Sequence, residues 1–347
     1  MKPIFTGYFG RHHIQGIALD LEKGYLYCSF TTQLVKLTLD GKLVGSVGGL
    51  TGHLGCIAFN RENGKVYGSL EYKNDAIGKG IAAEGHAEDA FLMTVFDVDK
   101  IDRPGMDAEA DGVVRAVYLK EVVEDYHGTG VHADGSPAPH RCGCSGIDGT
   151  AIGPMFGAPR GSKPYLFVAY GIYGETDRAD NDHQVLLGYD LDALNTAAVP
   201  LSAAIAHGGE ELRPAGRFFA FTGNTTWGVQ NLEYDPFTHA YFMAVYPGTK
   251  PQYGNYPLYA LDAAAAPVHA PLQGLDEAGA LLTLKPGTLT DAAGVSGWDF
   301  PWGSTGMFAA GDGTWYISRE GCDEQGQYSH IHRYVWDRKA PFVEKDT

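Results

Sequence analysis

The sequence predicts an all-β fold, a β-propeller of five blades, and three observations lead to it. One phrase recurs along the chain: a strand of small residues, a polar turn that ends in glycine, and an aromatic-rich strand. The chain contains 47 glycines, which suit many tight turns, and 12% of its residues are aromatic. A single repeat domain over residues 1–347 fits both features, because folds of this kind exceed the usual domain length.

The clearest copies of the phrase stand near the N-terminus. The segment His13–Ser29 aligns with His53–Ser69 at a constant spacing, so that His, Gly, Tyr and Ser meet their equivalents. Small residues suit the innermost strand of a blade, and the turn glycine supplies a positive φ. The phrase recurs with more drift at 147–170, 229–246 and 304–318. Five copies predict five blades, with six or seven as the alternative if the long second and third units hide further blades.

Each copy is followed by segments that fit the outer strands of a blade. The predicted outer strands are Leu34–Leu39 and Leu43–Val47, Phe91–Val98 and Val113–Val123, Val185–Leu191 and Phe218–Phe221, Leu258–Leu261 and Leu281–Leu284, and Ile331–Trp336 with the tail Pro341–Glu344. The last blade is thin, and Pro3–Tyr8 is a spare strand at the N-terminus. We therefore expect blades of four antiparallel strands in a ring that the two chain ends close together, which protects the sheet edges.

Charge and cysteine content narrow the partners and the compartment. The formal net charge of −16 argues against a nucleic acid or an anionic membrane as partner, because both need clustered Lys and Arg. No apolar run has the length of a signal peptide or a membrane span. The five cysteines show no disulfide spacing. We therefore expect a cytoplasmic protein whose partner is a small molecule or an oligosaccharide, in an oligomeric state that the sequence leaves open.

Loop lengths predict which face carries the site. When the strands of a blade are counted A to D from the axis outward, A–B and C–D turns share one face, and B–C loops and D–A crossings share the other. The A–B turns are short, whereas the long polar segments Glu71–Ala90, Gly171–His183 and Glu124–Gly146 fall in the other two classes. Functional residues concentrate on loops held by a rigid scaffold. The site is therefore expected at the channel mouth on the face of the B–C loops and D–A crossings.

Polar and aromatic residues near the starts of the A strands, the ends of the B strands and the adjoining loops are the candidate site residues. The candidate catalytic residues are His13, His53, Asp148, Glu71, Glu233, Tyr173 and Arg319. The candidate substrate-binding residues are Gln15, Gln230, Asn231, Tyr246, Lys250, Trp227, Trp298 and Trp302. Aromatic faces beside acids and amides suit sugars, because rings stack on C–H faces while polar groups bind hydroxyls. The alternative is that the polar groups only hydrate the channel and the tryptophans only seal adjacent blades.

No cofactor is required by the sequence, although a divalent metal, Ca²⁺ or a transition metal, could bind. His13 and His53 occupy matched positions in adjacent blades, so they are the candidate metal ligands, with a general base as the other role. The acidic run Asp177–His183 could hold Ca²⁺, but it lacks the regular ladder of a calcium loop. The segment His140–Cys144 lacks the second pair of ligands that structural zinc uses.

The repeat resembles the broad β-propeller superfamily, including lactonase-like bacterial propellers, over essentially the whole chain. The segment Thr222–Asp235 is similar to phrases in a bacterial propeller group without an assigned activity. The inferred architecture is similar to that of five-bladed glycosidases, which work with acidic residues at the channel mouth. It is also similar to that of propeller polysaccharide lyases, which use His, Tyr and Arg near a uronate. These likenesses concern the fold alone.

Two reactions fit the residue types at the expected mouth. A glycoside hydrolase would use two of Asp148, Glu71 and Glu233 as acid and as base or nucleophile. A uronate-type lyase would use a histidine as base and a tyrosine as acid, with Arg319 or Lys250 neutralising the carboxylate. The sequence thus predicts a carbohydrate-active enzyme of one of these kinds. The alternatives are a propeller that binds a ligand or partner without catalysis and a metal-dependent, lactonase-like hydrolase.

Overall fold

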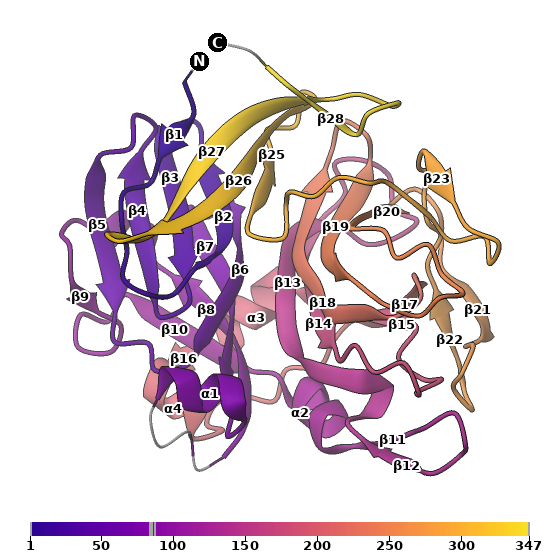
Figure 1. The fold of residues 1–347 in the computed structure, drawn as a ribbon. Coiled ribbons are helices and arrows are strands. Elements are labelled where there is room, and N and C mark those ends of the chain that lie inside the picture. Colours follow the sequence, from indigo (N-terminus) through magenta and orange to yellow (C-terminus); the bar gives the residue numbers. More distant parts are fainter. Residues whose placement is uncertain (1, 83–85, 87, 346–347) are drawn as a thin grey trace.

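The computed structural model describes residues 2–82, 86 and 88–345, and its main sheets form a ring of five blades (Figure 1). The innermost strands of the blades are β2 (Ile14–Asp20), β6 (His53–Asn60), β13 (Cys144–Pro154), β18 (Thr225–Asp235) and β25 (Met307–Ala309). Successive innermost strands contact one another, and β25 contacts β2, so the ring closes. The five-bladed propeller predicted from the repeat is confirmed.

Each innermost strand begins an antiparallel blade sheet. Blade 1 continues with β3 (Tyr25–Phe30), β4 (Gln33–Thr38) and β5 (Leu43–Gly48), and blade 2 with β7 (Lys65–Tyr72), β8 (Ala90–Phe96) and β10 (Val114–Tyr118). Blade 3 continues with β14 (Pro164–Ile172), β15 (His183–Asp190) and β17 (Gly216–Phe221), blade 4 with β19 (Ala240–Pro247) and β20 (Leu258–Asp262), and blade 5 with β26 (Thr314–Asp323) and β27 (Gly326–Trp336).

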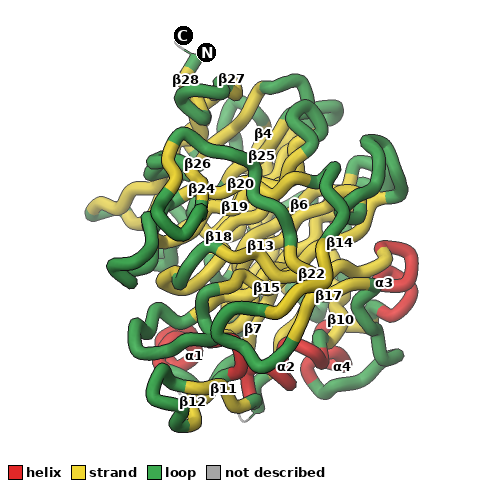
Figure 2. Tube along the Cα trace, turned by 90° about the vertical axis from the view of Figure 1, so that its right-hand side faces the viewer, coloured by secondary structure: helices red, strands yellow, loops and turns green. Residues whose placement is uncertain are grey.

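The two chain ends meet in blade 5. Strand β1 (Ile4–Phe5) pairs antiparallel with β27, with Ile4 opposite Ile331. Strand β28 (Phe342–Glu344) pairs with the other half of β27, with Phe342 opposite Trp336. The N-terminal segment and the C-terminal tail therefore complete the thin last blade, as the sequence predicts, and both termini lie at one end of the molecule (Figures 1 and 2).

Blade 2 differs from the prediction at its outer edge. The predicted strand Val113–Val123 is extended only as far as Tyr118, and the chain continues as helix α2 (Lys120–His127). The helix buries Val122 and Tyr126 in the apolar cluster between blades 2 and 3. Apolar residues along a strand and along one face of a short helix look alike in sequence, which is why the strand was predicted too long.

Blade 4 also differs, because its predicted outer strand Leu281–Leu284 is divided between two blades: Leu281 joins blade 3, and Leu284 bridges to Leu261 of blade 4. Leu281 ends β22 (Ala278–Leu281), which pairs in parallel with β17 and so extends blade 3, together with β21 (Val268–Pro271). In the described part of blade 4, single bridges from Leu258 to Trp298 and from Leu261 to Leu284 follow β20 in place of a fourth strand. A strand pattern shows that a segment is extended, but it does not show which sheet the segment joins.

Matched residues of the repeat connect neighbouring blades by hydrogen bonds. Ser29 Oγ of blade 1 donates to the Gly55 carbonyl of blade 2 at 2.7 Å, and Ser69 Oγ of blade 2 donates to the Asp148 carbonyl of blade 3 at 3.0 Å. Both serines are on B strands, and each reaches the innermost strand of the next blade. A buried hydrogen bond of this kind contributes about 0.5–1.5 kcal/mol. The repeated serine thus has a structural explanation.

The long loops, both within blades and between them, contain the short helices and the β11–β12 hairpin. Helix α1 (Ala76–Ile81) lies between strands B and C of blade 2, and α2 and the hairpin of β11 (Thr129–Val131) and β12 (Pro137–Pro139) lie between blades 2 and 3. These three elements lie at the end of the molecule away from the termini (Figures 1 and 2). The other elements are β9 (Met106–Asp107), α3 (Leu191–Ala197), β16 (Val199–Pro200), α4 (Leu201–Ile205), β23 (Leu289–Thr290) and β24 (Ser296–Gly297). Within the described ranges, no helix is long and apolar enough to cross a bilayer.

Candidate functional site

A cavity of about 350 Å³ lies where the innermost strands of blades 1 to 4 begin, and helix α1 forms part of its wall. Blade 1 provides His13, Gln15 and Thr31; blade 2 provides His53, Glu71 and Lys73; the strands and crossings of blades 3 and 4 provide Ser145, Asp148, Trp227, Gln230 and Tyr246. Small-molecule sites enclose about 300–1,000 Å³, so the cavity has the size of a ligand site. It lies on the face that the loop lengths indicate.

His53 and Asp148 face each other in the wall of this cavity. The distance from His53 Nδ1 to Asp148 Oδ1 is 3.8 Å, and each side chain is 15% exposed. Both atoms are buried, and neither has a hydrogen-bond partner among the described residues. The separation exceeds a hydrogen bond, but catalytic contacts are often long before substrate binds. A small movement would bring the two atoms into contact.

The environment shifts the pKa values of this pair in opposite directions. Burial, with a smaller contribution from Lys73, lowers the pKa of His53 to about 3. Burial, with the neighbouring Glu71 carboxylate, raises the pKa of Asp148 well above its ordinary value. The imidazole is therefore uncharged at neutral pH, and the Asp148 carboxyl keeps its proton to a higher pH than an ordinary aspartate does. Groups poised in this way can exchange protons with a bound molecule.

A buried ion pair, Glu71 with Lys73, lines the same cavity as Asp148. Glu71 Oε2 lies 2.8 Å from Lys73 Nζ, and the two side chains are 3% and 4% exposed. The Lys73 ammonium also donates to the Ser145 carbonyl at 2.9 Å, and the Ile147 amide donates to Glu71 Oε1. Burial opposes the charge of Lys73, but the carboxylates of Glu71 and Asp75 outweigh it and raise the pKa of Lys73. Because both charges are satisfied within the protein, the pair positions its neighbours rather than offering a free charge.

Two buried side-chain amides, those of Gln15 and Gln230, form hydrogen bonds in the polar part of the cavity wall. We call this part, with Thr31, His13 and Asp148, the polar floor. Gln15 Nε2 lies 3.0 Å from His13 Nε2 and 3.3 Å from Thr31 Oγ1. Gln230 Nε2 donates to the Trp227 carbonyl at 2.9 Å and to Asp148 Oδ2 at 3.3 Å. Burial, with the neighbouring His12, lowers the pKa of His13, so this second imidazole is also neutral.

Glycines bring the backbone close to the carboxyl groups of the site. A Cβ on Gly55 would lie 2.6 Å from Ser69 Oγ and 3.0 Å from Asp148 Oδ1, and a Cβ on Gly146 would lie 2.0 Å from Glu71 Oε1. Any side chain at these positions would displace the carboxyl groups. Sequence reasoning missed these glycines, because 47 glycines in a turn-rich chain give no signal for any particular one.

The structure places several candidate site residues outside the cavity. Asn231 lies on the axis, where its Nδ2 donates to the carbonyls of Gln15 at 2.9 Å and Ser304 at 2.8 Å, and Cys56 Sγ contacts its Oδ1 at 3.3 Å. It therefore joins blades 1, 2, 4 and 5. Tyr173 packs behind the cavity, with its ring 5.8 Å from that of Trp227 and 5.0 Å from that of His140.

Glu233 lies in a different cavity, together with residues of the A–B turns such as Arg61 and Pro236. Its Oε1 accepts a hydrogen bond from the Ala309 amide at 2.8 Å, and burial raises its pKa to about 8. Glu233 is near the end of its A strand, whereas Asp148 is near the start of one. Of the three predicted acids, Asp148 and Glu71 therefore line one cavity, and Glu233 lines another.

The two cations expected at the mouth are engaged elsewhere. Arg319 pairs with Glu344 at 2.7 Å, donates to the Tyr334 hydroxyl and lies 5.1 Å from the ring centre of Trp302. It therefore ties β26 to the C-terminal strand.

Lys250 is buried beneath the acidic run Asp177–His183. Its ammonium donates to the Arg178 carbonyl and to Asn181 Oδ1, both at 2.7 Å, and to Asp182 Oδ1 at 2.5 Å. Arg178 in turn binds Asp180 through two hydrogen bonds. Cationic side chains of the protein thus satisfy acidic residues that were considered as Ca²⁺ ligands.

The three tryptophans expected at the mouth have different positions. Trp298 is 2% exposed and packs against Phe242 and Trp336, so it belongs to the core of blades 4 and 5. Trp302 stacks with an arginine and does not line the cavity. Trp227 is 40% exposed and lines the cavity. Of this group, Trp227 alone keeps the expected position.

Among the described residues, no three His, Cys, Asp or Glu side chains form a group that could hold a metal ion. His13 and His53, the candidate metal ligands, line one cavity with Asp148. His13 Nε2 lies 3.0 Å from Gln15 Nε2, and His53 Nδ1 lies 3.8 Å from Asp148 Oδ1.

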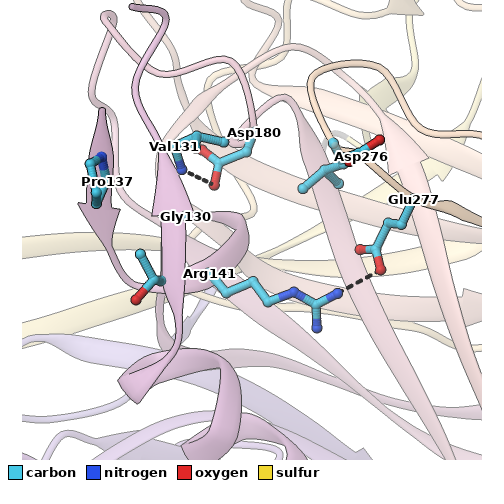
Figure 3. Close-up of a pocket in the computed structure, with 9 residues that line it drawn as sticks. Gly130, Val131, Pro137, Arg141, Asp180, Asp276 and Glu277 are labelled. Carbon is cyan, nitrogen blue, oxygen red and sulfur yellow. Dashed lines mark hydrogen bonds and ion pairs between the residues drawn. The ribbon is translucent and has the colours of Figure 1, made fainter. Parts of the chain in front are cut away.

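A second cavity of about 360 Å³ lies beside the β11–β12 hairpin (Figure 3). Two contacts join residues of its lining: Arg141 contacts Glu277 at 2.6 Å, and Asp180 accepts from the Val131 amide at 3.3 Å, while Asp276 is exposed. Figure 3 shows these two contacts spanning the cavity wall. The second cavity contains one buried titratable atom without a hydrogen-bond partner among the described residues, Glu277 Oε1. The cavity at the channel mouth is the stronger candidate, because two such atoms, His53 Nδ1 and Asp148 Oδ1, face each other there.

No protein-family model and no curated protein matches the chain. Several solved structures are similar to it at low identity. A calcium-containing structure of a carbohydrate-active enzyme of family AA12 from Trichoderma reesei has 12% identity and a TM-score of 0.36, over 91% of this chain and 80% of that one. A gluconolactonase from Xanthomonas campestris has 10% identity and a TM-score of 0.34, over 95% of both chains. A protein of unknown function from Desulfotomaculum acetoxidans has 12% identity and a TM-score of 0.35, over 95% of this chain and 73% of that one.

Proposed function

We propose that the cavity is the active site of a carbohydrate-active hydrolase, which cleaves a neutral glycoside with His53 and Asp148 as its acid–base pair. The observation that carries this proposal is the 3.8 Å approach of two buried titratable atoms that lack partners among the described residues. Buried polar groups with a purely structural role are normally hydrogen-bonded. A pair whose pKa values are shifted apart is typical of acid–base catalysis.

The surroundings of the pair support a sugar as the substrate. The amides of Gln15 and Gln230 and the hydroxyl of Thr31 are suited to sugar hydroxyls, and the exposed indole of Trp227 offers a face to C–H groups. The volume of about 350 Å³ is at the lower end for small-molecule sites, which favours a short saccharide.

A neutral sugar is favoured over a uronate because the site offers no free cation among its described residues. Neutralising a uronate carboxylate needs an available positive charge. Arg319 and Lys250 are paired with Glu344 and Asp182, and Lys73 in the cavity wall is paired with Glu71. The hydrolase interpretation is therefore preferred to the lyase interpretation.

In the proposed reaction, Asp148 donates its proton to the glycosidic oxygen as the bond between that oxygen and the anomeric carbon breaks. Because the two groups are only 3.8 Å apart, they act on the same face of the sugar. Water therefore enters from the side that the alcohol has left, bonds to the anomeric carbon through its oxygen, and gives one proton to the neutral imidazole of His53. That proton then returns to Asp148, which restores the pair. The products are a free sugar and an alcohol. Glu71, held by Lys73, favours the protonated form of Asp148 before each cycle.

The test is a screen of neutral and uronate-containing oligosaccharides and aryl glycosides with the purified protein. We expect release of neutral sugar without an unsaturated, ultraviolet-absorbing product. Asp148→Asn should lower kcat/KM by about 100-fold or more, as expected when a general acid is lost. Glu233→Gln, in the other cavity, is the matched control and should leave kcat/KM unchanged. An unsaturated product would instead support a lyase, and absence of turnover across the panel would support a binding protein.

A further inference from the structure

The cavity at the channel mouth has an apolar wall beside its polar floor. Helix α1 directs Ile77, Gly80 and Ile81 to the cavity, and these positions at i, i+3 and i+4 form one face of the helix. Trp227 also lines the cavity. Ile77 is 37% exposed and Trp227 is 40% exposed. Scattered exposed apolar residues are normal on a protein surface, but here they border the same cavity as the acid–base pair.

The position of α1 is fixed by the polar site itself. Asp75 caps the helix, because its Oδ1 accepts a hydrogen bond from the Gly78 amide at 2.8 Å, and its Oδ2 lies 3.6 Å from Lys73 Nζ. Gly78 lets the helix pack directly on the backbone just after β7, since a Cβ there would lie 1.8 Å from the Lys73 carbonyl oxygen. The orientation of α1, and with it the direction of Ile77, therefore depends on the contact between Asp75 and Lys73.

Trp227 is fixed to the polar floor in a comparable way. Its backbone has a φ of 65°, in the left-handed region that L residues rarely adopt. Its carbonyl accepts a hydrogen bond from Gln230 Nε2 at 2.9 Å, and the same nitrogen lies 3.3 Å from Asp148 Oδ2. The side-chain amide of Gln230 therefore connects the backbone of Trp227 to the Asp148 carboxyl.

We propose that the ligands of this site are glycosides with an apolar aglycone, an aryl or alkyl group, rather than oligosaccharides with a polar neighbour. The sugar would lie on the floor of amides and hydroxyls, and the aglycone against Ile77, Ile81 and Trp227. This inference rests on the proposed function, since it assumes that a sugar binds at the His53–Asp148 pair. It adds the chemical class of the group on the other side of the glycosidic oxygen.

The experiment compares phenyl and methyl glycosides of glucose, galactose, xylose and arabinose, which share a sugar and differ in the aglycone. Binding is measured by calorimetry with the Asp148→Asn protein, so that turnover does not interfere, and kcat/KM is measured with the unmodified protein. For the sugar that binds, the phenyl glycoside should bind about 10-fold more tightly than the methyl glycoside, as expected for burying a small apolar group.

The variants Ile77→Ser and Ile81→Ser should reduce this phenyl-to-methyl ratio to nearly one. Val268→Ser removes an apolar side chain that is 60% exposed on β21, and it should leave the ratio unchanged. The inference is overturned if the unmodified protein has a phenyl-to-methyl ratio near one, or if both isoleucine variants keep the ratio of the unmodified protein. Either result overturns it even if glycosides are hydrolysed. A ratio that depends on Ile77 without any hydrolysis supports the inference and rejects the hydrolase. Absence of binding by every glycoside rejects both.

Discussion

Replacing Lys73 with methionine should destabilise the protein much more than replacing an exposed lysine. Lys73 is 4% exposed, pairs with Glu71 at 2.8 Å and donates to the Ser145 carbonyl at 2.9 Å. Methionine has a similar length, but it leaves the Glu71 carboxylate buried without its cation. Loss of one partner of a buried ion pair costs about 3–5 kcal/mol. We expect the free energy of unfolding to fall by about that amount.

Urea denaturation of three variants measures this effect. Lys42→Met is the control, because the Lys42–Asp40 pair is exposed on both sides and should leave the free energy of unfolding unchanged. The double variant Lys73→Met with Glu71→Gln should recover part of the stability, since no unpaired charge stays buried. The reasoning is refuted if Lys73→Met is as mild as Lys42→Met, or if the double variant is less stable than Lys73→Met alone.

Three further predictions concern Asn231 on the propeller axis, the space around the Asp148 carboxyl, and the dependence of stability on pH. Asn231→Ala should lower the free energy of unfolding by about 3 kcal/mol in urea, because two buried carbonyls lose their donor; a loss below about 1 kcal/mol would show that Asn231 does not connect the blades. Gly55→Ala should lower kcat/KM by about 10-fold, because its Cβ would lie 3.0 Å from Asp148 Oδ1, whereas Gly48→Ala meets nothing within 4 Å and is the control. The folded protein keeps His53 neutral down to about pH 3, while the unfolded chain protonates it below 6.5, so acid destabilises the folded state within that window. His53→Gln should therefore lose less stability between pH 6.5 and 3 than the unmodified protein, and an unchanged pH profile would contradict the low pKa.

The fold was predictable because each repeat can be recognised from residues that are close together in the sequence. The alignment of His13–Ser29 with His53–Ser69 identifies the innermost strands, and the matched serines form equivalent hydrogen bonds between blades. The outer edges were less predictable. Val113–Val123 becomes partly helical and Leu281 joins blade 3, because the choice of partner sheet depends on packing that the local sequence does not contain.

The candidate site was predictable where the strand direction decides the position. His13, His53, Asp148 and Gln230 stand near the starts of A strands, so a ring brings them to one mouth. Positions that depend on side-chain direction were not predictable.

Lys250 and Arg319 turn away to bind carboxylates. Glu233 is a different case, because it lies near the other end of its strand, and that position alone excludes it from the mouth. Ile77 and Ile81 stand at i, i+4 within the predicted loop Glu71–Ala90, and this spacing is the sequence signal for the helix that presents them to the cavity.

The most direct test of the central claim is a crystal structure of the Asp148→Asn protein with a neutral aryl glycoside. We predict that the sugar occupies the cavity at the channel mouth, with its glycosidic oxygen within hydrogen-bond distance of the residue at position 148 and its hydroxyls on Gln15 and Gln230. A glycoside in the second cavity beside Arg141, or one whose glycosidic oxygen is out of reach of both His53 and position 148, would contradict the account.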